Sequence, residues 1–160
     1  LYSSFDLFTN FQSLYCTQTE AASRAFIKLF LTYYFYMNIN DFKDVEYINL
    51  ITYKKDGSSV TTPVWVAPHD NSLVVTTSLN AGKVKRVRNN GKATIYVTNQ
   101  SGTKKLSESM DVRGSLILDS VVKTEAINKI KKKYGAISKL FLRGPDENRA
   151  IIQLDELGGE

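Results

Sequence analysis

The sequence predicts a mostly β fold, a small antiparallel barrel or sandwich of about six strands with a few helices. Short segments rich in Val, Ile, Thr and Tyr recur at intervals of about 8–12 residues and are separated by turn signals, a pattern typical of all-β domains. Only residues 80–90 and 124–134 carry the spacing of three and four that an amphipathic helix requires.

In chain order, strands are expected over the following segments: residues 46–53, 60–67, 72–77, 93–98, 108–119 and 149–154. Asp56-Gly57 predicts a hairpin turn between the first two, and residues 68–71 predict another turn. Pro63 has no N–H to donate, so it marks an edge, a bulge or a place where a ligand replaces a neighbouring strand. Gly114, near the middle of its strand, suggests a bulge or a bend.

Two helices are expected. In residues 80–90, Val84 and Val87 lie three apart, and Asn89-Asn90-Gly91 is a C-terminal stop signal. Residues 124–134 follow a candidate cap, Thr124, and end at Gly135. Four apolar or aromatic side chains of this second helix share one face: Ala126, Ile127, Ile130 and Tyr134.

Composition limits the possible chemistry. The chain has 160 residues and is long enough to bury a core without disulfides. One cysteine, Cys16, excludes an internal disulfide framework and a multi-cysteine zinc site. One histidine, His69, would have to serve any Ser-His-Asp or Cys-His mechanism. The formal net charge of +5 favours an anionic partner.

Residues 1–36 differ from the rest, and we expect an extension there, helical or disordered, before a domain over residues 37–160. The apolar run at residues 25–37 contains Lys28 and is about 13 residues long, whereas a membrane-spanning helix needs about 20. No basic region precedes the run and no small-residue cleavage site follows it, so a secretory signal fits poorly. An interfacial or partner helix and a surplus segment before Met37 both remain open.

The segment from Thr77 to Arg88 is the strongest candidate for binding chemistry. A strand ends at Thr77, and a short loop leads into a helix that carries Lys83 and Arg86 one turn apart. The free N–H groups at a helix start, with two nearby cations, suit one phosphate group. The glycine spacing of a Walker loop is absent. A solvated basic helix face, with Lys85 on it, is the alternative.

Four segments in this order resemble the pyridoxamine 5′-phosphate oxidase-like split β-barrel superfamily: residues 47–57, 60–66, 73–77 and 82–86. Within it, the chain is most similar to the coenzyme F420-dependent (deazaflavin) oxidoreductases, and Lys132-Lys133-Tyr134-Gly135 fits the same branch. The resemblance covers roughly residues 43–143.

The resemblance implies a split barrel that forms a homodimer, with the cofactor in a groove between the subunits. Thr77, Lys83 and Arg86 match the phosphate site of the superfamily. The strand segment expected along the cofactor ring comprises Thr62, Pro63, Val64 and Trp65. The oxidases carry Arg directly before the phosphate lysine. Gly82 occupies that position here, which favours F420 over FMN.

If the cofactor performs the chemistry, no side chain is needed as a nucleophile or metal ligand, and none is assigned. The chain is then an oxidoreductase that transfers hydride to or from a small organic substrate in the cytoplasm, without a nucleic-acid or membrane partner. An FMN-binding oxidase-like protein, a non-catalytic flavin or deazaflavin carrier and, least favoured, a nucleic-acid-binding barrel are the alternatives. Nucleic-acid barrels place aromatic residues along a basic groove, whereas here they are scattered and the basic residues lie on a helix.

Several other residues carry weaker expectations. His69 is expected to be an exposed turn residue rather than an acid, a base or a metal ligand. Trp65 would stack on the cofactor ring or fill the barrel, and Tyr53 and Tyr96 would pack across strands. The run of lysines that includes Lys133 predicts a solvated helix face.

Overall fold

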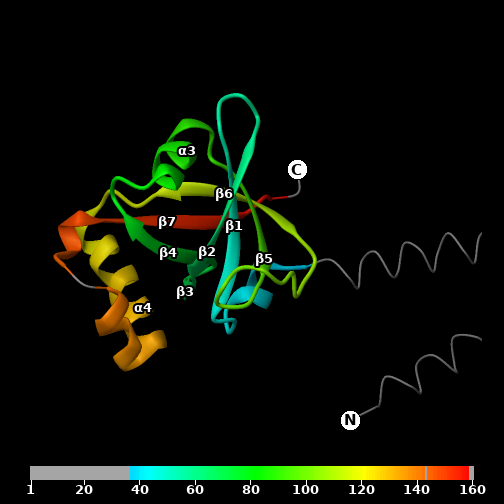
Figure 1. Cartoon of the computed structure of the whole chain (residues 1–160). Helices are drawn as coiled ribbons and strands as arrows, with labels where there is room; N and C mark the ends of the chain where they lie inside the picture. Colours follow the sequence, from blue (N-terminus) through cyan, green and yellow to red (C-terminus); the bar gives the residue numbers. More distant parts are fainter. Residues whose placement is uncertain (1–36, 143, 159–160) are drawn as a thin grey trace, which may run out of the picture. The chain divides into compact units, whose positions relative to one another are not determined.

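A computed structural model describes residues 37–142 and 144–158 (Figure 1). The expectation for residues 1–36 falls outside the described residues. The described part contains a single antiparallel sheet of seven strands with helices packed against it, so the mostly β prediction is confirmed. The strands are β1 (Tyr47–Tyr53), β2 (Ser59–Trp65), β3 (Ala67–His69), β4 (Ser72–Ser78), β5 (Lys92–Val97), β6 (Met110–Leu116) and β7 (Arg149–Glu156).

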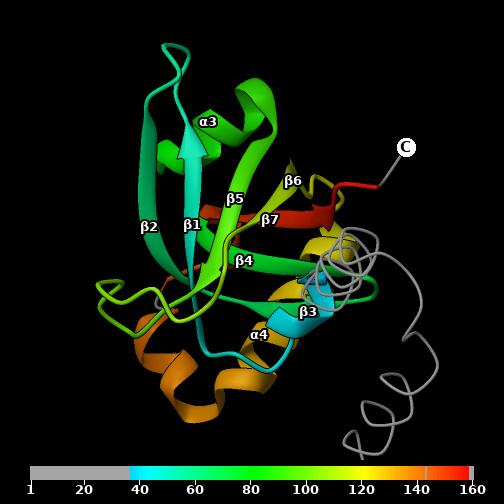
Figure 2. The ribbon, with the colours of Figure 1, turned by 90° about the vertical axis from the view of Figure 1, so that its right-hand side faces the viewer.

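The order of the strands across the sheet explains its shape. That order is β2-β1-β5-β6-β7-β4-β3, so the first and last strands of the sheet are consecutive in the chain. Only Val66 separates β2 from β3. Because one short segment supplies both edges, the sheet curls until these edges approach each other and form a barrel that is open along one side (Figure 2). The sequence prediction of one strand over residues 60–67 is therefore corrected to two strands that pair at opposite edges.

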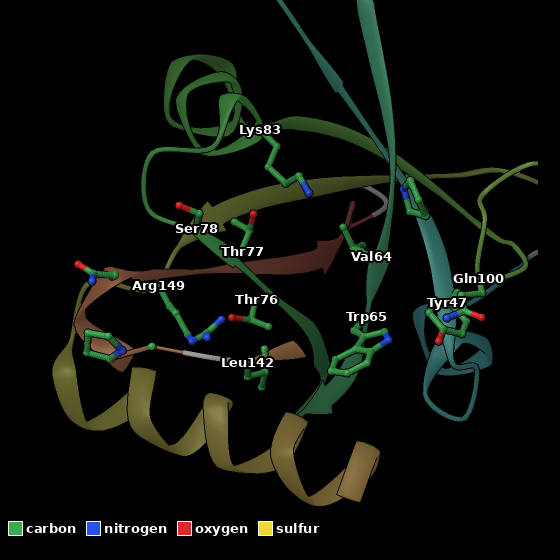
Figure 3. Close-up of a pocket in the computed structure, with 14 residues that line it drawn as sticks. Tyr47, Val64, Trp65, Thr76, Thr77, Ser78, Lys83, Gln100, Leu142 and Arg149 are labelled. Atoms are coloured by element: carbon green, nitrogen blue, oxygen red, sulfur yellow. The ribbon is translucent and has the colours of Figure 1, made fainter. Parts of the chain in front are cut away.

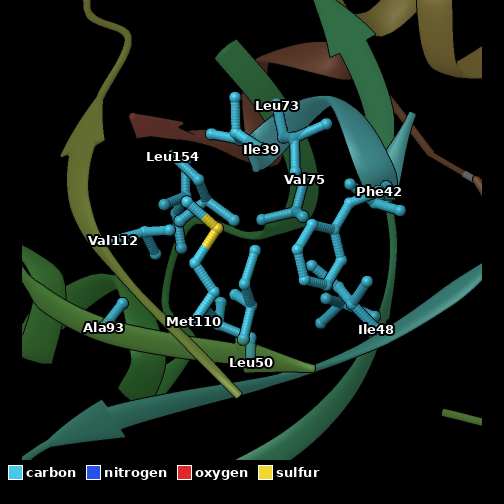
Figure 4. Packing of buried hydrophobic residues seen from close by; sticks show 14 of the residues in the cluster. Ile39, Phe42, Ile48, Leu50, Leu73, Val75, Ala93, Met110, Val112 and Leu154 are labelled. Carbon is cyan, nitrogen blue, oxygen red and sulfur yellow. The ribbon is translucent and has the colours of Figure 1, made fainter. Parts of the chain in front are cut away.

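Alternate side chains of the strands fill the interior of the curled sheet (Figure 4). A 3-10 helix, η1 (Ile39–Phe42), contributes Ile39 and Phe42 to this core, and α3 (Gly82–Asn90) contributes Val87. In both ribbon views η1 and α3 lie at opposite ends of the sheet (Figures 1 and 2). Helix α3 ends at Gly91, as predicted, with the left-handed φ of 65° that favours glycine.

Helix α4 (Ser120–Phe141) covers the outer face of β3, β4 and β7. The predicted apolar face is confirmed, because Ala126, Ile127 and Ile130 pack against apolar side chains of these strands. The helix begins earlier than predicted. The Asp119 carboxylate accepts hydrogen bonds from the Val121 and Val122 amides, whereas Thr124 donates its hydroxyl to the Ser120 carbonyl.

Other boundaries are also corrected. Gly135 has the non-helical backbone expected at the end of a helix, and a second helical segment follows this kink and extends α4 to Phe141. Strand β6 is shorter than the predicted run, and Gly114 pairs with Leu154 in an ordinary ladder rather than forming a bulge. A side chain at Gly114 would place Cβ 3.3 Å from Val87 Cγ1, so glycine there permits the close approach of α3.

His69 is the clearest correction. The residue belongs to β3, where it pairs with Ser72, and it is only 6% exposed, so it is not the exposed turn residue that the sequence predicted. The turn is confined to Asp70 and Asn71. In the described ranges, no helix has the length and apolar character needed to cross a membrane.

Candidate functional site

A pocket of about 630 Å³ lies in the open side of the barrel (Figure 3). Strand β3 pairs with β4 only over Ser72–Val74, while β4 continues to Ser78. The continuation of β4 therefore faces the edge of β2 across a slit. The lining comes mainly from β2, β4, α3 and the segment that leads into β7, with single residues from the start of β1, the loop after β5 and the start of β7: Tyr47, Pro63, Val64, Trp65, Thr76, Thr77, Ser78, Lys83, Gln100, Leu142, Gly144, Pro145, Asn148 and Arg149.

The pocket gathers most of the residues that the sequence singled out. Pro63, Val64 and Trp65 line it from β2, and Thr77 and Lys83 line it from β4 and α3. Pro63 lies on an edge strand, one of the three settings that its missing N–H predicted.

Thr62 and Arg86 are not among the lining residues. Arg86 instead donates from Nε to the Thr52 hydroxyl at 2.7 Å, and its guanidinium lies over Gly82, where a Cβ would come within 2.8 Å of Nη1. The glycine that precedes Lys83 thus leaves room for this arginine. In the structure Arg86 contacts Thr52 and Gly82 and does not line the pocket with Lys83.

The Lys83 ammonium is a partly buried positive charge in the pocket. Burial lowers the pKa of Lys83, and the positive charge of Arg86 lowers this pKa further. In the part of the chain that the structure describes, Lys83 forms no salt bridge. A partly buried cation without a counter-ion favours an anion from solution, because the anion would offset the lost hydration.

Trp65 forms one wall of the pocket and is held there by α4. Its ring stacks on Tyr134 with centroids 4.3 Å apart and planes 7° from parallel. The Tyr134 hydroxyl accepts from the Val66 amide at 2.9 Å, and it lies 2.5 Å from the Glu46 carbonyl, to which it donates. Trp65 therefore stacks on a residue of its own chain, an arrangement that the sequence analysis did not consider.

Lys133 also connects α4 to the backbone at Val66, next to Trp65. Its ammonium donates to three backbone carbonyls, those of Lys43 at 2.8 Å, Val45 at 2.7 Å and Val66 at 2.8 Å. Burial lowers the pKa of Lys133, while Asp44 and Glu46 act in the opposite direction. The prediction of a solvated lysine face is wrong for this residue. The Lys132–Gly135 motif was the signal that could have revealed its role.

The two other tyrosines make cross-strand contacts, as predicted. The Tyr53 hydroxyl lies 2.8 Å from that of Thr94 on β5, and the Asn49 amide donates to the Tyr96 hydroxyl at 2.8 Å. Neither lines the pocket. Sequence reasoning missed Thr76 and Arg149, which line the pocket from β4 and β7.

No protein-family model and no curated protein matches this chain. Solved structures do match, and they include the heme storage protein HutZ from Vibrio cholerae, at 14% identity over 77% of this chain and 93% of that one, with a TM-score of 0.57. A FAD-binding protein from Mesorhizobium loti is also 14% identical over 75% and 88% of the two chains, with a TM-score of 0.57.

An F420 reductase is 17% identical over 76% of this chain and 95% of that one, with a TM-score of 0.52. At identities this low, the similarity establishes a common fold and does not transfer a ligand. The three named proteins share that fold although their names state different ligands.

Proposed function

We propose that this chain, which has the split β-barrel fold of the pyridoxamine 5′-phosphate oxidase-like proteins, binds a flavin-type redox cofactor in the β2–β4 pocket. The phosphate lies against Thr77 and Lys83, and the ring lies along the segment Thr62–Trp65. The protein transfers hydride to or from a small organic substrate and acts as a cytoplasmic homodimer.

The observation that carries this proposal is the position of Lys83. Its ammonium is partly buried in a pocket, and among the described residues it has no salt-bridge partner. A phosphate would restore the lost charge compensation, and the Thr77 hydroxyl lines the same pocket as a further donor. The residues present therefore fit the phosphate end of such a cofactor.

The side chains of this protein bind and orient, and the bound cofactor supplies the carbon that gives or accepts hydride. Lys83 and Thr77 fix the anionic end. The edge of β2, which includes Pro63, offers a flat surface without an N–H at that residue. Trp65, immobilised by Tyr134, and Leu142 shield the pocket from water.

F420 is the first choice of cofactor and FMN the second, because Gly82 stands where the oxidases have arginine. The F420 reductase and the FAD-binding protein of the same fold support a flavin-type ligand. Because a heme storage protein has the same fold, a non-catalytic cofactor carrier is the second candidate function. Turnover of the bound cofactor with a substrate would distinguish an enzyme from a carrier.

Calorimetric titration of the full chain with F420 and with FMN tests the proposal, and tighter binding of F420 is expected. Lys83→Ala should weaken binding by about 1.5–3 kcal/mol, because a charged hydrogen bond to phosphate is lost. Lys85→Ala is the matched control, since Lys85 lies on the same helix, is exposed and does not line the pocket. Equal cofactor affinities of Lys83→Ala and Lys85→Ala would show that Lys83 does not bind the phosphate. Tighter binding of FMN than of F420 would make FMN the preferred cofactor.

A further inference from the structure

Tyr47 and Trp65 lie side by side in the wall of the pocket. They are register partners on the antiparallel strands β1 and β2, so their side chains leave the same face of the sheet. Asn49 and Pro63 are the next pair on this face, two positions further along each strand. The alternate residues of both strands fill the core, so this face points away from it.

The loop after β5 brings Gln100 to the same place. The Asn49 side-chain amide donates to the Gly102 carbonyl at 2.8 Å. Gly102 has a φ of 73°, and it lies so close to Pro63 that a Cβ would be 3.0 Å from Cβ and Cγ of the proline ring. The loop is thereby fixed against β1 and β2. Figure 3 shows Gln100, which lines the pocket from this loop, beside Tyr47.

Both polar groups are available to a ligand. Within the described part of the chain, no hydrogen bond involves the Tyr47 hydroxyl or the Gln100 side-chain amide. Tyr47 is half-buried and Gln100 is exposed at the opening. A phenol hydroxyl can donate one hydrogen bond, and a carboxamide can both donate and accept.

This end of the pocket is distant from the Lys83 end. Helix α3, which carries Lys83, meets β1 where Arg86 donates to the Thr52 hydroxyl. A strand rises about 3.4 Å per residue, so Thr52 and Tyr47 lie about 17 Å apart along β1. The phosphate that we place at Lys83 therefore leaves the Tyr47 end for another group.

The Tyr47 end also lacks charge. Among the described residues that line the pocket there is no Asp or Glu, and the two cations are Lys83 and Arg149. In Figure 3 both cations lie across Trp65 from Tyr47. A charged ligand group would lose hydration beside Tyr47 without a counter-ion, whereas an uncharged polar group would exchange water for the side-chain hydrogen bonds.

We propose that Tyr47 and Gln100 form a subsite that binds an uncharged amide group, a carbonyl beside an N–H. The Tyr47 hydroxyl donates to the carbonyl oxygen, and the Gln100 oxygen accepts from the N–H. The amide belongs either to the substrate or to the ring of the cofactor. The inference rests on the proposed function for the cofactor that occupies the rest of the pocket.

Three uncharged probes with the same aromatic ring test the subsite. Benzamide offers a carbonyl and an N–H, N,N-dimethylbenzamide offers only the carbonyl, and toluene offers neither. Trp65 is the only tryptophan of the chain and lines the pocket, so the NMR signal of its indole N–H reports binding.

Tyr47→Phe should weaken the binding of benzamide and of N,N-dimethylbenzamide about fivefold each, because the hydrogen bond to the carbonyl is lost. Gln100→Met should weaken benzamide about fivefold and leave N,N-dimethylbenzamide within twofold, since that probe has no N–H. Both variants should bind toluene within twofold of the unmodified protein. Neither substitution removes a hydrogen bond between described residues, so both variants should fold.

Tyr53→Phe and Gln153→Met are the matched controls. Each makes the same chemical change outside the pocket, where Tyr53 bonds to Thr94 and Gln153 to Asp155. Both controls should bind benzamide within twofold of the unmodified protein.

Titrations of F420-saturated and FMN-saturated protein identify the source of the amide. Benzamide that binds to both forms and still depends on Tyr47 assigns the subsite to a substrate. If a cofactor excludes benzamide, the subsite belongs to the cofactor ring, and Tyr47→Phe should then weaken that cofactor about fivefold. Exclusion of benzamide without this loss overturns the subsite.

An equal loss of toluene and benzamide in Tyr47→Phe overturns the subsite, as does a failure of benzamide to bind. If neither cofactor binds while benzamide still depends on Tyr47 and Gln100, the proposed function fails and the subsite stands. If the cofactors bind and both variants keep the full affinity for benzamide, the subsite fails and the proposed function stands.

Discussion

Tyr134 joins helix α4 to the pocket wall through both its ring and its hydroxyl. The ring stacks on Trp65, and the hydroxyl hydrogen-bonds to the backbone at Val66 and Glu46. Burial raises the pKa of Tyr134 from 10.0 to about 12, while the hydrogen bond to Val66 partly opposes this effect. The folded protein therefore retains the phenolic proton at pH values where the unfolded chain has lost it.

This difference predicts a pH-dependent stability. The stabilising effect of the Tyr134 proton is complete below about pH 10 and is lost as the pH rises towards about 12. Tyr134→Phe keeps the stack but leaves the Val66 amide without its acceptor, which should cost about 1–3 kcal/mol below pH 10. Urea denaturation of both proteins should show this gap narrowing above pH 10. A gap that stays constant up to pH 12 would contradict the assignment.

The places of individual residues in the fold were predictable where their signal is local. Pro63 lies on an edge strand, Thr77 lies near the end of a strand and Lys83 near the start of a helix, and all three patterns lie within a few neighbouring positions. Arg149 and Thr76 meet only through the register of β4 with β7, which single-sequence patterns do not encode. Helical spacing predicts that Arg86 lies near Lys83, but it does not predict the hydrogen bond of Arg86 to Thr52.

At the scale of elements, α4 begins at a different N-cap from the one that the sequence predicts. The predicted cap is Thr124, and the cap in the structure is Asp119. Asp119→Ala removes two hydrogen bonds to the first helical amides and should destabilise the protein by about 1 kcal/mol. Thr124→Ala, at the cap that the sequence predicted, should change stability by less than about 0.5 kcal/mol. Thermal denaturation of the two variants decides between the two caps. A larger loss of stability for Thr124→Ala than for Asp119→Ala would refute Asp119 as the N-cap.

The strand at residues 60–67 shows why element boundaries were harder to predict than element types. Its composition is β-compatible throughout, and nothing local marks Val66 as a break. The division arises because β2 pairs with β1 while β3 pairs with β4 at the other edge. Tertiary pairing, rather than propensity, sets that boundary.

At the scale of the whole domain, the short helix η1 adds two buried side chains, Ile39 and Phe42, to the core of the curled sheet. Phe42 is fully buried in the core (Figure 4), so Phe42→Ala should cost about 3–5 kcal/mol through lost burial and a residual cavity. Leu118→Ala is the control, because Leu118 is 85% exposed and should change stability by less than about 0.5 kcal/mol. Similar urea midpoints for the two variants would show that η1 is dispensable.

The fold class was predictable because strand periodicity and turn signals are spread over the whole domain. Asp56-Gly57 does form the expected turn, with Gly57 at a φ of 83°. The buried place of His69 was not predictable, since it depends on β3 pairing with β4. Local composition predicts a turn there, and long-range pairing overrides it.

The backbone passes from one edge of the sheet to the other at Val66, directly after Trp65 in the pocket wall. Both the amide and the carbonyl of Val66 are bonded to side chains of α4. Helix α4 therefore holds the backbone from outside the curled sheet at the point where the chain leaves the pocket wall, and a change that loosens α4 would loosen that wall as well.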